Sequence, residues 1–292
     1  MAPPIALITG ASSGIGLALT KHLLEKKWNV VIADVQPPKE ELENSLFIPT
    51  DISSWDQQAS TFKQAYEWNS RLDFVALNAG IDDRDDIFHS ISKDPAKPPT
   101  RPNMRTIDVN LTGTYYGIKL AAHYLSLPSS KPTPGGKIIV TASAAGIYPL
   151  PVIPQYAASK HGLVGMVRSM ASVARPHNIT INAICPALVP TSLPPPGLLD
   201  HFSPDQLTPM ATLIRAFTEL ADLDNVDKPD WVEDGKNGEV VECNIENLIY
   251  HPAPARPNGS RHLSAEGMRA WAETYVGRNR GFVEEGGGSN SS

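Results

Sequence analysis

A glycine-rich turn between an apolar run and an amphipathic run constrains the fold of this chain most strongly. Residues 5–8 (IALI) are typical of a buried strand, and residues 17–28 of a helix with one apolar face. Between them stand Gly10, Ser12, Ser13, Gly14, Ile15 and Gly16. Glycines let backbone N–H groups approach a phosphate, and a helix N-terminus adds a favourable dipole. The strand, turn and helix together predict that the chain binds a dinucleotide.

Composition narrows the classes of partner. The net charge of −6 and the lack of a long basic run exclude nucleic acid as an expected partner. No run approaches the ~18 apolar residues of a membrane span, and the chain enters an apolar strand at once, so we expect neither a span nor a secretory signal. Cys185 and Cys243 lie in apolar segments, which favours free thiols in a cytoplasmic protein over a disulfide. We assign no metal site.

The order of elements predicts the fold class. Strand-like and helix-like segments alternate, so we expect an α/β fold: a single Rossmann-type, doubly wound parallel sheet of about seven strands with helices on both faces. The expected strands lie near 5–9, 29–33, 46–49, 73–78, 137–142, 179–185 and 239–243. The expected helices lie near 15–27, 54–70, 102–126 and 155–175, with another within 204–223.

The chain is expected to have a catalytic part and an extension. Residues 1–250 form the dinucleotide-binding domain, with a substrate lid at about 190–230. The charged, proline-rich segment 82–105 is interpreted as a loop inserted before a helix. Residues 251–292 form a C-terminal extension with a short helical pattern at 264–276 and a disordered end at 286–292.

Asp34 ends the second expected strand, about 20 residues after the glycine turn. A carboxylate there can accept hydrogen bonds from the adenosine ribose hydroxyls and would repel a 2′-phosphate. No basic residue follows until Lys39, so we predict NAD as the cofactor in preference to NADP. The alternative is an aspartate that only caps a turn.

Ser143, Tyr156 and Lys160 carry the chemistry that the sequence suggests. Tyr156 and Lys160 are four residues apart in an expected helix and therefore share a face. Ser143 directly follows an expected strand, which places it at the carboxyl end of the sheet with the ligand. Alcohol oxidation needs a base, and a nearby ammonium favours the phenolate of a tyrosine. The Ser143 hydroxyl would hold the substrate oxygen.

These motifs resemble those of the short-chain dehydrogenase/reductase family: the T-G-x-x-x-G-I-G turn, Asn78-Ala79-Gly80, and Tyr156-x-x-x-Lys160. The resemblance implies that Asn78, Ala79 and Gly80 lie against the cofactor. It implies that Asn110 bends its helix and holds a water linked to the lysine. Further cofactor contacts implied by it are Asp51, Ile52, Pro186, Val189 and Thr191. Asp51 could also cap the helix that begins near Ser54. Leu77 and Ala187 depart from the family pattern, where asparagine and glycine are usual.

Within the family, residues 108–117, 158–165 and 181–186 are most similar to the group of 15-hydroxyprostaglandin dehydrogenases. The group implies NAD-linked oxidation of a secondary alcohol, and the family implies a homodimer or homotetramer. The expected substrate pocket is mostly uncharged, which favours a hydrophobic alcohol or ketone as the small-molecule partner. The pocket residues are Ser143, Ile147, Tyr148, Ile153 and Leu193.

Two alternatives stay open at this point. The chain could be a cofactor-binding scaffold or sensor without turnover, although a scaffold has no need of Tyr156. It could also use the same fold for a dehydration or cyclisation in secondary metabolism, because one fold hosts many chemistries.

Overall fold

The computed structural model describes residues 3–88, 91–129, 131, 134–224, 235–255 and 264–286. The chain divides into two compact units, Met1–Pro252 and Ala253–Ser292. The second unit contains helix α8 (Ala265–Gly286), which is longer than the helical pattern at 264–276. Of the end expected to be disordered, Gly286 belongs to α8, and residues 287–292 lie outside the described residues.

The first unit is built on one eight-stranded sheet of order β3-β2-β1-β4-β5-β6-β7-β8, and the predicted fold class is confirmed. Every neighbouring pair is parallel except the last, β7 with β8. The strands are β1 (Ile5–Thr9), β2 (Asn29–Asp34), β3 (Ser45–Pro49), β4 (Phe74–Leu77), β5 (Gly136–Thr141), β6 (Ile179–Pro186), β7 (Val240–Asn244) and β8 (Asn247–Tyr250).

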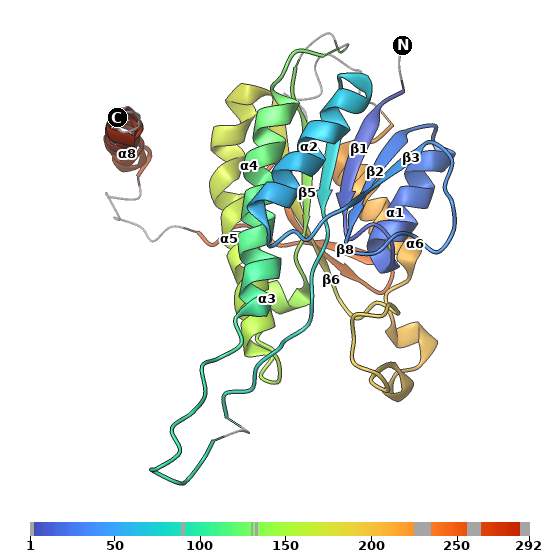
Figure 1. Cartoon of the computed structure of the whole chain (residues 1–292), viewed down its shortest axis with the longest axis vertical. Helices are drawn as coiled ribbons and strands as arrows, with labels where there is room; N and C mark the ends of the chain where they lie inside the picture. The colour runs from blue at the N-terminus through green and yellow to red at the C-terminus, as the bar shows by residue number, and fades with distance from the viewer. Residues whose placement is uncertain are drawn as a thin grey trace, which may run out of the picture. The chain divides into compact units, whose positions relative to one another are not determined.

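Helices cover both faces of this sheet, α2, α4 and α5 on one side and α1 and α6 on the other (Figure 1). Side chains of a strand alternate between the faces, so Ile5 and Leu7 of β1 pack under the first group and Ala6 and Ile8 under the second. Both faces are buried, which explains the continuous apolar runs of the strands. The helices are α1 (Gly14–Glu25), α2 (Trp55–Asn69), α4 (Thr114–Leu125), α5 (Pro154–Ala174) and α6 (Met210–Ala221).

The expected helix over 102–126 has three parts. A single turn, α3 (Arg105–Ile107), leads into a π-helical segment, η1 (Asp108–Gly113), and then into α4. Over the described residues between β4 and α3 there is no helix or strand, in agreement with the loop expected at 82–105.

The sequence prediction ended the sheet at 239–243 and missed β8. The two-residue connection before β8 carries no glycine or asparagine at its bend, and Ile245 has a φ of 52°, which a β-branched residue rarely adopts. Two threonines near α6 hold this turn: Ile245 N donates to Thr208 Oγ1 at 3.0 Å, and Thr212 Oγ1 donates to the Ile245 carbonyl at 2.7 Å. These contacts come from a segment distant in sequence, so no local signal marks the hairpin.

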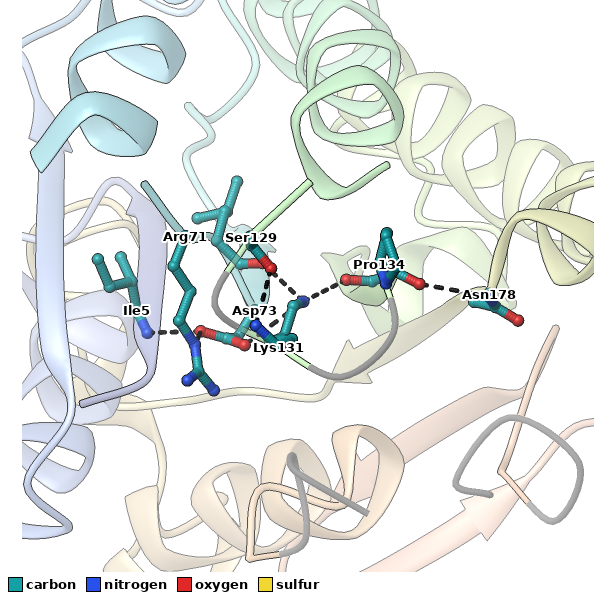
Figure 2. Close-up of polar contacts among 9 residues, drawn as sticks. Ile5, Arg71, Asp73, Ser129, Lys131, Pro134 and Asn178 are labelled. Carbon is teal, nitrogen blue, oxygen red and sulfur yellow. Dashed lines mark hydrogen bonds and ion pairs between the residues drawn. The ribbon is translucent and has the colours of Figure 1, made fainter. Parts of the chain in front are cut away.

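A buried charge network holds the strands at the end of the sheet where β1 and β4 begin (Figure 2). The Asp73 carboxylate pairs with Arg71 Nε at 2.7 Å and with Lys131 Nζ at 3.4 Å. It also accepts a hydrogen bond from Ile5 N at 2.8 Å. Lys131 Nζ donates in addition to the Leu72 carbonyl. A single carboxylate, 2% exposed, thus joins β1, β4 and the connection that leads into β5.

We expect Asp73→Ala to reduce the free energy of unfolding by about 3–5 kcal/mol, because it leaves two buried cations without their shared anion. Urea denaturation measures this loss. The control is Asp94→Ala, which removes an exposed partner of Lys97 and is expected to cost less than about 1 kcal/mol. Equal losses for the two variants would contradict a structural role for the network.

Candidate active site

The glycine turn follows β1 and is packed too tightly for side chains. Gly10 and Gly14 have φ values of 64° and 51°, the left-handed region that favours glycine. A Cβ on Gly10 would lie 2.8 Å from Ala79 Cα, and one on Gly16 would lie 2.1 Å from the Gly10 carbonyl oxygen. A Cβ on Gly14 would lie 3.3 Å from the Thr191 methyl group. The predicted turn residues, Ala79 and Thr191 therefore lie together in the structure.

Polar contacts between β1 and β4 fix the position of this turn. The Asn78 and Ala79 N–H groups donate to Thr9 Oγ1 at 3.0 and 3.1 Å, and Asn78 Nδ2 donates to the Thr9 and Gly10 carbonyls. Ser13 is the N-cap of α1, but its side chain makes no capping hydrogen bond. The first N–H groups of α1 therefore have no side-chain cap, which is the arrangement that receives a phosphate at a helix N-terminus.

Asp34 lies at the end of β2 beside the same turn. Its Oδ2 accepts a hydrogen bond from Ser12 N at 2.9 Å, and its Oδ1 accepts one from Gln36 N at 3.3 Å. Ser12 Oγ donates to the Gln36 carbonyl at 2.6 Å. The carboxylate thus caps a turn, as the alternative interpretation proposed, and also stands next to the glycine turn.

Asp51 does not cap the following helix. Ser54 is the N-cap of α2 and accepts from Gln57 N, whereas Asp51 Oδ1 accepts from the N–H and hydroxyl of Ser53. The hydrogen bond from the Ser53 hydroxyl lowers the pKa of Asp51 below its usual value. Ile52 is buried, and its carbonyl lies against Gly113 of η1.

Ser143, Tyr156 and Lys160 meet at the carboxyl end of β5. Lys160 Nζ lies 5.4 Å from the centre of the Tyr156 ring and donates to the Thr141 carbonyl at 2.9 Å. Ser143 begins a short 3-10 turn, η2 (Ala144–Gly146), and its Oγ accepts from Ala145 N. Tyr156 is 8% exposed and Lys160 is 3% exposed. The structure therefore brings together the three residues that were predicted to carry the chemistry.

Burial dominates the acid–base properties of this group. It raises the pKa of Tyr156, while a hydrogen bond with Ser143 acts in the opposite direction and the Asp82 carboxylate raises that pKa further. Burial lowers the pKa of Lys160 to about 8. The expected lowering of the Tyr156 pKa by the Lys160 ammonium is therefore absent here. On burial the phenolate loses more stabilisation by water than the neighbouring groups give back.

Asn110 sits within the π-helical segment and is fully buried. Its Oδ1 accepts from Ile81 N at 2.8 Å, and its Nδ2 donates to the Ile81 carbonyl at 2.9 Å. A Cβ on Gly80 would lie 3.3 Å from Asn110 Oδ1 and 3.4 Å from Lys160 Nζ. Asn110, Gly80 and Lys160 therefore form one contact surface, and the helix changes from α- to π-helical geometry around Asn110.

The segment that follows β6 carries the last of the predicted cofactor contacts. Val189 is buried against the core, and Thr191 N donates to the Val189 carbonyl. Ala187, where the family usually has glycine, does not have a positive φ, and its N–H donates to the Cys243 carbonyl at 2.9 Å. The alanine therefore causes no backbone strain. Cys185 and Cys243 are buried free thiols, as predicted.

The residues expected to line the substrate pocket differ in their burial and in their contacts. Ile153 packs against Tyr156, and Leu193 is exposed. Ile147 packs against the core beneath α5. The Tyr148 ring is partly exposed, and its hydroxyl donates to Glu242 Oε2 at 2.8 Å.

The sequence analysis missed Glu242, a buried acid on β7. Its carboxylate accepts hydrogen bonds from Tyr148, from His251 at 2.8 Å and from Asn244 at 2.9 Å. Burial raises the pKa of Glu242, but these three hydrogen bonds together hold it below its usual value. They join the loop after Ser143 to the β7–β8 hairpin. A glutamate in an otherwise apolar strand was the available signal.

Comparison with known proteins shows the family to which the chain belongs. The sequence model of the short chain dehydrogenase family matches residues 4–195. A short-chain dehydrogenase/reductase of Penicillium rubens, prx6, is 30% identical and covers 94% of this chain and 93% of its own. The 15-hydroxyprostaglandin dehydrogenase [NAD(+)] of Macaca fascicularis is 33% identical over 65% of this chain and 69% of its own.

Solved structures share the fold. A 3-ketoacyl-(acyl-carrier-protein) reductase of Brucella melitensis, complexed with NADH, covers 82% of this chain and 96% of its own with a TM-score of 0.67 and 21% identity. ElxO with NADP bound covers 82% of this chain and 97% of its own with a TM-score of 0.65 and 22% identity. The chain belongs to the short-chain dehydrogenase/reductase family of oxidoreductases, and the predicted resemblance is confirmed. Within the described part of the chain, no helix is long and apolar enough to cross a bilayer.

We expect Lys160→Met to stabilise the fold at pH 7 by on the order of 3 kcal/mol, because it removes a buried charge whose pKa is lowered from 10.5 to about 8. Between pH 8 and 10.5 the unfolded chain binds more protons than the native one, so wild-type stability rises through that window relative to the variant. Urea denaturation at pH 7 and pH 10 measures the difference. Lys119→Met, at an exposed lysine of α4, is the control. A constant offset for Lys160→Met across this range would contradict the shift.

Proposed function

We propose that this protein is an NAD-dependent oxidoreductase that transfers a hydride between NAD(H) and a hydrophobic secondary alcohol or ketone. The single observation that carries the proposal is the meeting of Ser143, Tyr156 and Lys160 beside the glycine turn. The phenol, the ammonium and the hydroxyl come from two elements, η2 and α5, and converge where parallel strands end. Ligands of doubly wound folds bind at this end of the sheet.

The residues around the turn suit a dinucleotide. The spaces beside Gly10, Gly14 and Gly16 admit no Cβ without contact, and the N-terminus of α1 lacks a side-chain cap. Thr141 Oγ1 is buried without a hydrogen-bond partner among the described residues, and its carbonyl holds Lys160. The residues that would hold the cofactor are Gly10, Ser12–Gly16, Asp34, Asp51, Ile52, Asn78–Gly80, Tyr156, Lys160, Pro186, Val189 and Thr191. When bound, its nicotinamide ring supplies the hydride donor or acceptor.

Tyr156 exchanges the proton in this proposal. With its pKa raised by burial, the phenol keeps its proton at neutral pH and can donate it to a carbonyl oxygen during reduction. During oxidation the phenolate accepts the alcohol proton, and the positively charged nicotinamide ring of a bound cofactor would favour that form. Ser143 Oγ holds the same substrate oxygen, and Lys160 Nζ keeps a cation beside the phenol.

Apolar side chains near the site support a hydrophobic substrate. Ile153 packs directly on Tyr156, and Leu150, Val152, Leu193 and Phe202 are exposed on the loops after β5 and β6. We propose that these loops form the substrate pocket and that the part of 190–230 before α6 acts as its lid; α6 itself packs against the sheet, and residues 225–230 lie outside the described residues.

Asp34 supports NAD over NADP. Its carboxylate is fixed by Ser12 N and Gln36 N at the end of β2, where a 2′-phosphate would meet a negative charge. The name of the macaque relative includes NAD(+), whereas ElxO was solved with NADP, so the fold admits either cofactor and the choice depends on local residues.

The proposal also covers the oligomeric state of the protein, its location in the cell and its domains. A largely apolar groove of about 470 Å³ lies between α4 and α5, lined by residues that include Ile118, Met170 and Val173. We propose a homodimer or homotetramer on the family resemblance. Two buried free thiols support a cytoplasmic location. Residues 1–250 would form the catalytic domain and 251–292 an extension.

We expect Tyr156→Phe to abolish turnover, by at least about a hundred-fold, while NAD still binds, because only the hydroxyl that carries the exchangeable proton is removed. Steady-state kinetics with a panel of hydrophobic secondary alcohols and ketones, and calorimetry with NAD, give the two readouts. Tyr115→Phe, which removes the same atom from an exposed tyrosine on α4, is the control. A Tyr156→Phe enzyme with full activity would exclude the proposed proton donor. A wild-type protein that binds NAD but turns over no alcohol or ketone would favour the scaffold.

We expect Asp34→Ala to reduce the preference for NAD over NADP by about ten-fold or more, because the repulsion of a 2′-phosphate is removed. The ratio of kcat/KM for the two cofactors measures the preference. Asp56→Ala, on the first turn of α2, is the control and should leave the ratio unchanged. An unaltered ratio in Asp34→Ala would remove Asp34 from the ribose site.

A further inference from the structure

The helix that carries Tyr156 and Lys160 begins without a local cap. Ile153 is its N-cap residue and offers no side-chain hydrogen bond, and Pro154 at the first position has no N–H group. The first N–H donors of α5 are therefore those of Gln155 and Tyr156. Uncapped N–H groups at a helix start need an acceptor from elsewhere.

That acceptor is the carboxylate of Asp83. Its Oδ2 accepts from Gln155 N at 2.9 Å and from Tyr156 N at 3.2 Å. The Asp83 side chain is 72 residues away from Gln155 in sequence and belongs to the loop inserted between β4 and α3. A negative charge at this position also interacts favourably with the helix dipole.

The segment that carries Asp83 is itself fixed by hydrogen bonds to the neighbouring helical segments. Asn110 of η1 holds both the N–H and the carbonyl of Ile81, and Thr106 of α3 donates from Oγ1 to the Asp82 carbonyl at 3.0 Å. Asp83 Oδ1 accepts from Asp85 N at 3.2 Å, which orients the carboxyl group. The segment that carries this cap is therefore held by Asn110, the same asparagine that lies against Gly80 and Lys160.

We propose that Asp83 is a positioning residue for Tyr156, so that the inserted loop sets the geometry of the reactive phenol. The inference rests on the proposed function, in which Tyr156 exchanges the substrate proton. Tyr156 is the third residue of α5, and the hydrogen bond to its own N–H holds its backbone in the first turn. Without it, that turn frays and the phenol loses its fixed position relative to Lys160 and Ser143.

Asp82 and Asp83 act differently in this arrangement. The charged or titratable groups that face the Tyr156 phenol are Asp82 from the inserted loop, Cys185 from β6 and Lys160 from α5, together with the Ser143 hydroxyl. Asp83 instead bonds to the backbone. Loss of Asp83 should therefore reduce turnover without moving the midpoint of the pH–rate profile.

The test compares Asp83→Ala, Asp83→Asn and Asp83→Glu, with Asp85→Ala as a control in the same loop. We expect kcat per NAD-binding site to fall ten- to a hundred-fold in Asp83→Ala, since small displacements of a reacting group have effects of this size. Asp83→Asn keeps an oxygen acceptor and should retain kcat within about three-fold. In Asp83→Ala and Asp83→Asn the affinity for NAD should change less than three-fold.

A purely structural role would lower the thermal midpoint of Asp83→Ala and leave kcat per NAD-binding site equal to that of Asp85→Ala, which overturns the proposal. Equal losses in the alanine and asparagine variants would also overturn it, because they would assign the effect to charge. If Asp83→Ala does not fold, Asp83→Glu decides: its displaced carboxylate should lower kcat by three-fold or more, and wild-type kcat would overturn the proposal.

An inactive Tyr156→Phe beside a fully active Asp83→Ala would reject this inference alone, whereas an active Tyr156→Phe would reject the proposed function itself.

Discussion

The arrangement of the site depends on one buried ammonium group. Lys160 is 3% exposed, and its hydrogen-bond acceptor is a backbone carbonyl, that of Thr141, rather than a carboxylate. Among the described residues it forms no ion pair, so the cost of removing its charge from water is not offset by an anion. A cation held in this way can act on the group beside it, although burial outweighs it here and keeps the pKa of that group raised. That group is the Tyr156 ring.

Small residues make this placement possible. A Cβ on Gly80 would press on Lys160 Nζ, and one on Gly146 would lie 2.7 Å from the Lys160 carbonyl oxygen. Gly10 and Gly16 are crowded in the same way around the turn after β1. Glycine thus lets β4, η2 and the turn after β1 approach α5 and α1 closely, and backbone atoms line the site where side chains would otherwise fill it.

Short-range patterns made much of this architecture predictable. The apolar runs specified the seven parallel strands, and the spacing of Tyr156 and Lys160 placed both on one helix face. The missed features depend on contacts between distant segments. The β7–β8 turn is held by Thr208 and Thr212, Glu242 joins the loop after β5 to that hairpin, and Asp83 caps a helix from a loop. Asp51 was considered as a cap of α2. In the structure Ser54 is the N-cap, and Asp51 instead accepts a hydrogen bond from Ser53 N.

Charged groups are buried at both ends of the sheet, but their surroundings differ. Where β1 and β4 begin, Asp73 is paired with Arg71 and Lys131, so the cost of burial is shared among opposite charges. Where the strands end, Lys160 is buried beside the Tyr156 ring, and among the described residues it has no such anion. The charges of the Asp73 network are used to hold the strands, because they pair with each other and with backbone groups of Ile5 and Leu72. The ammonium at the other end remains available to a ligand because no described residue pairs with it, so the stability that it costs is inseparable from the chemistry that it can perform.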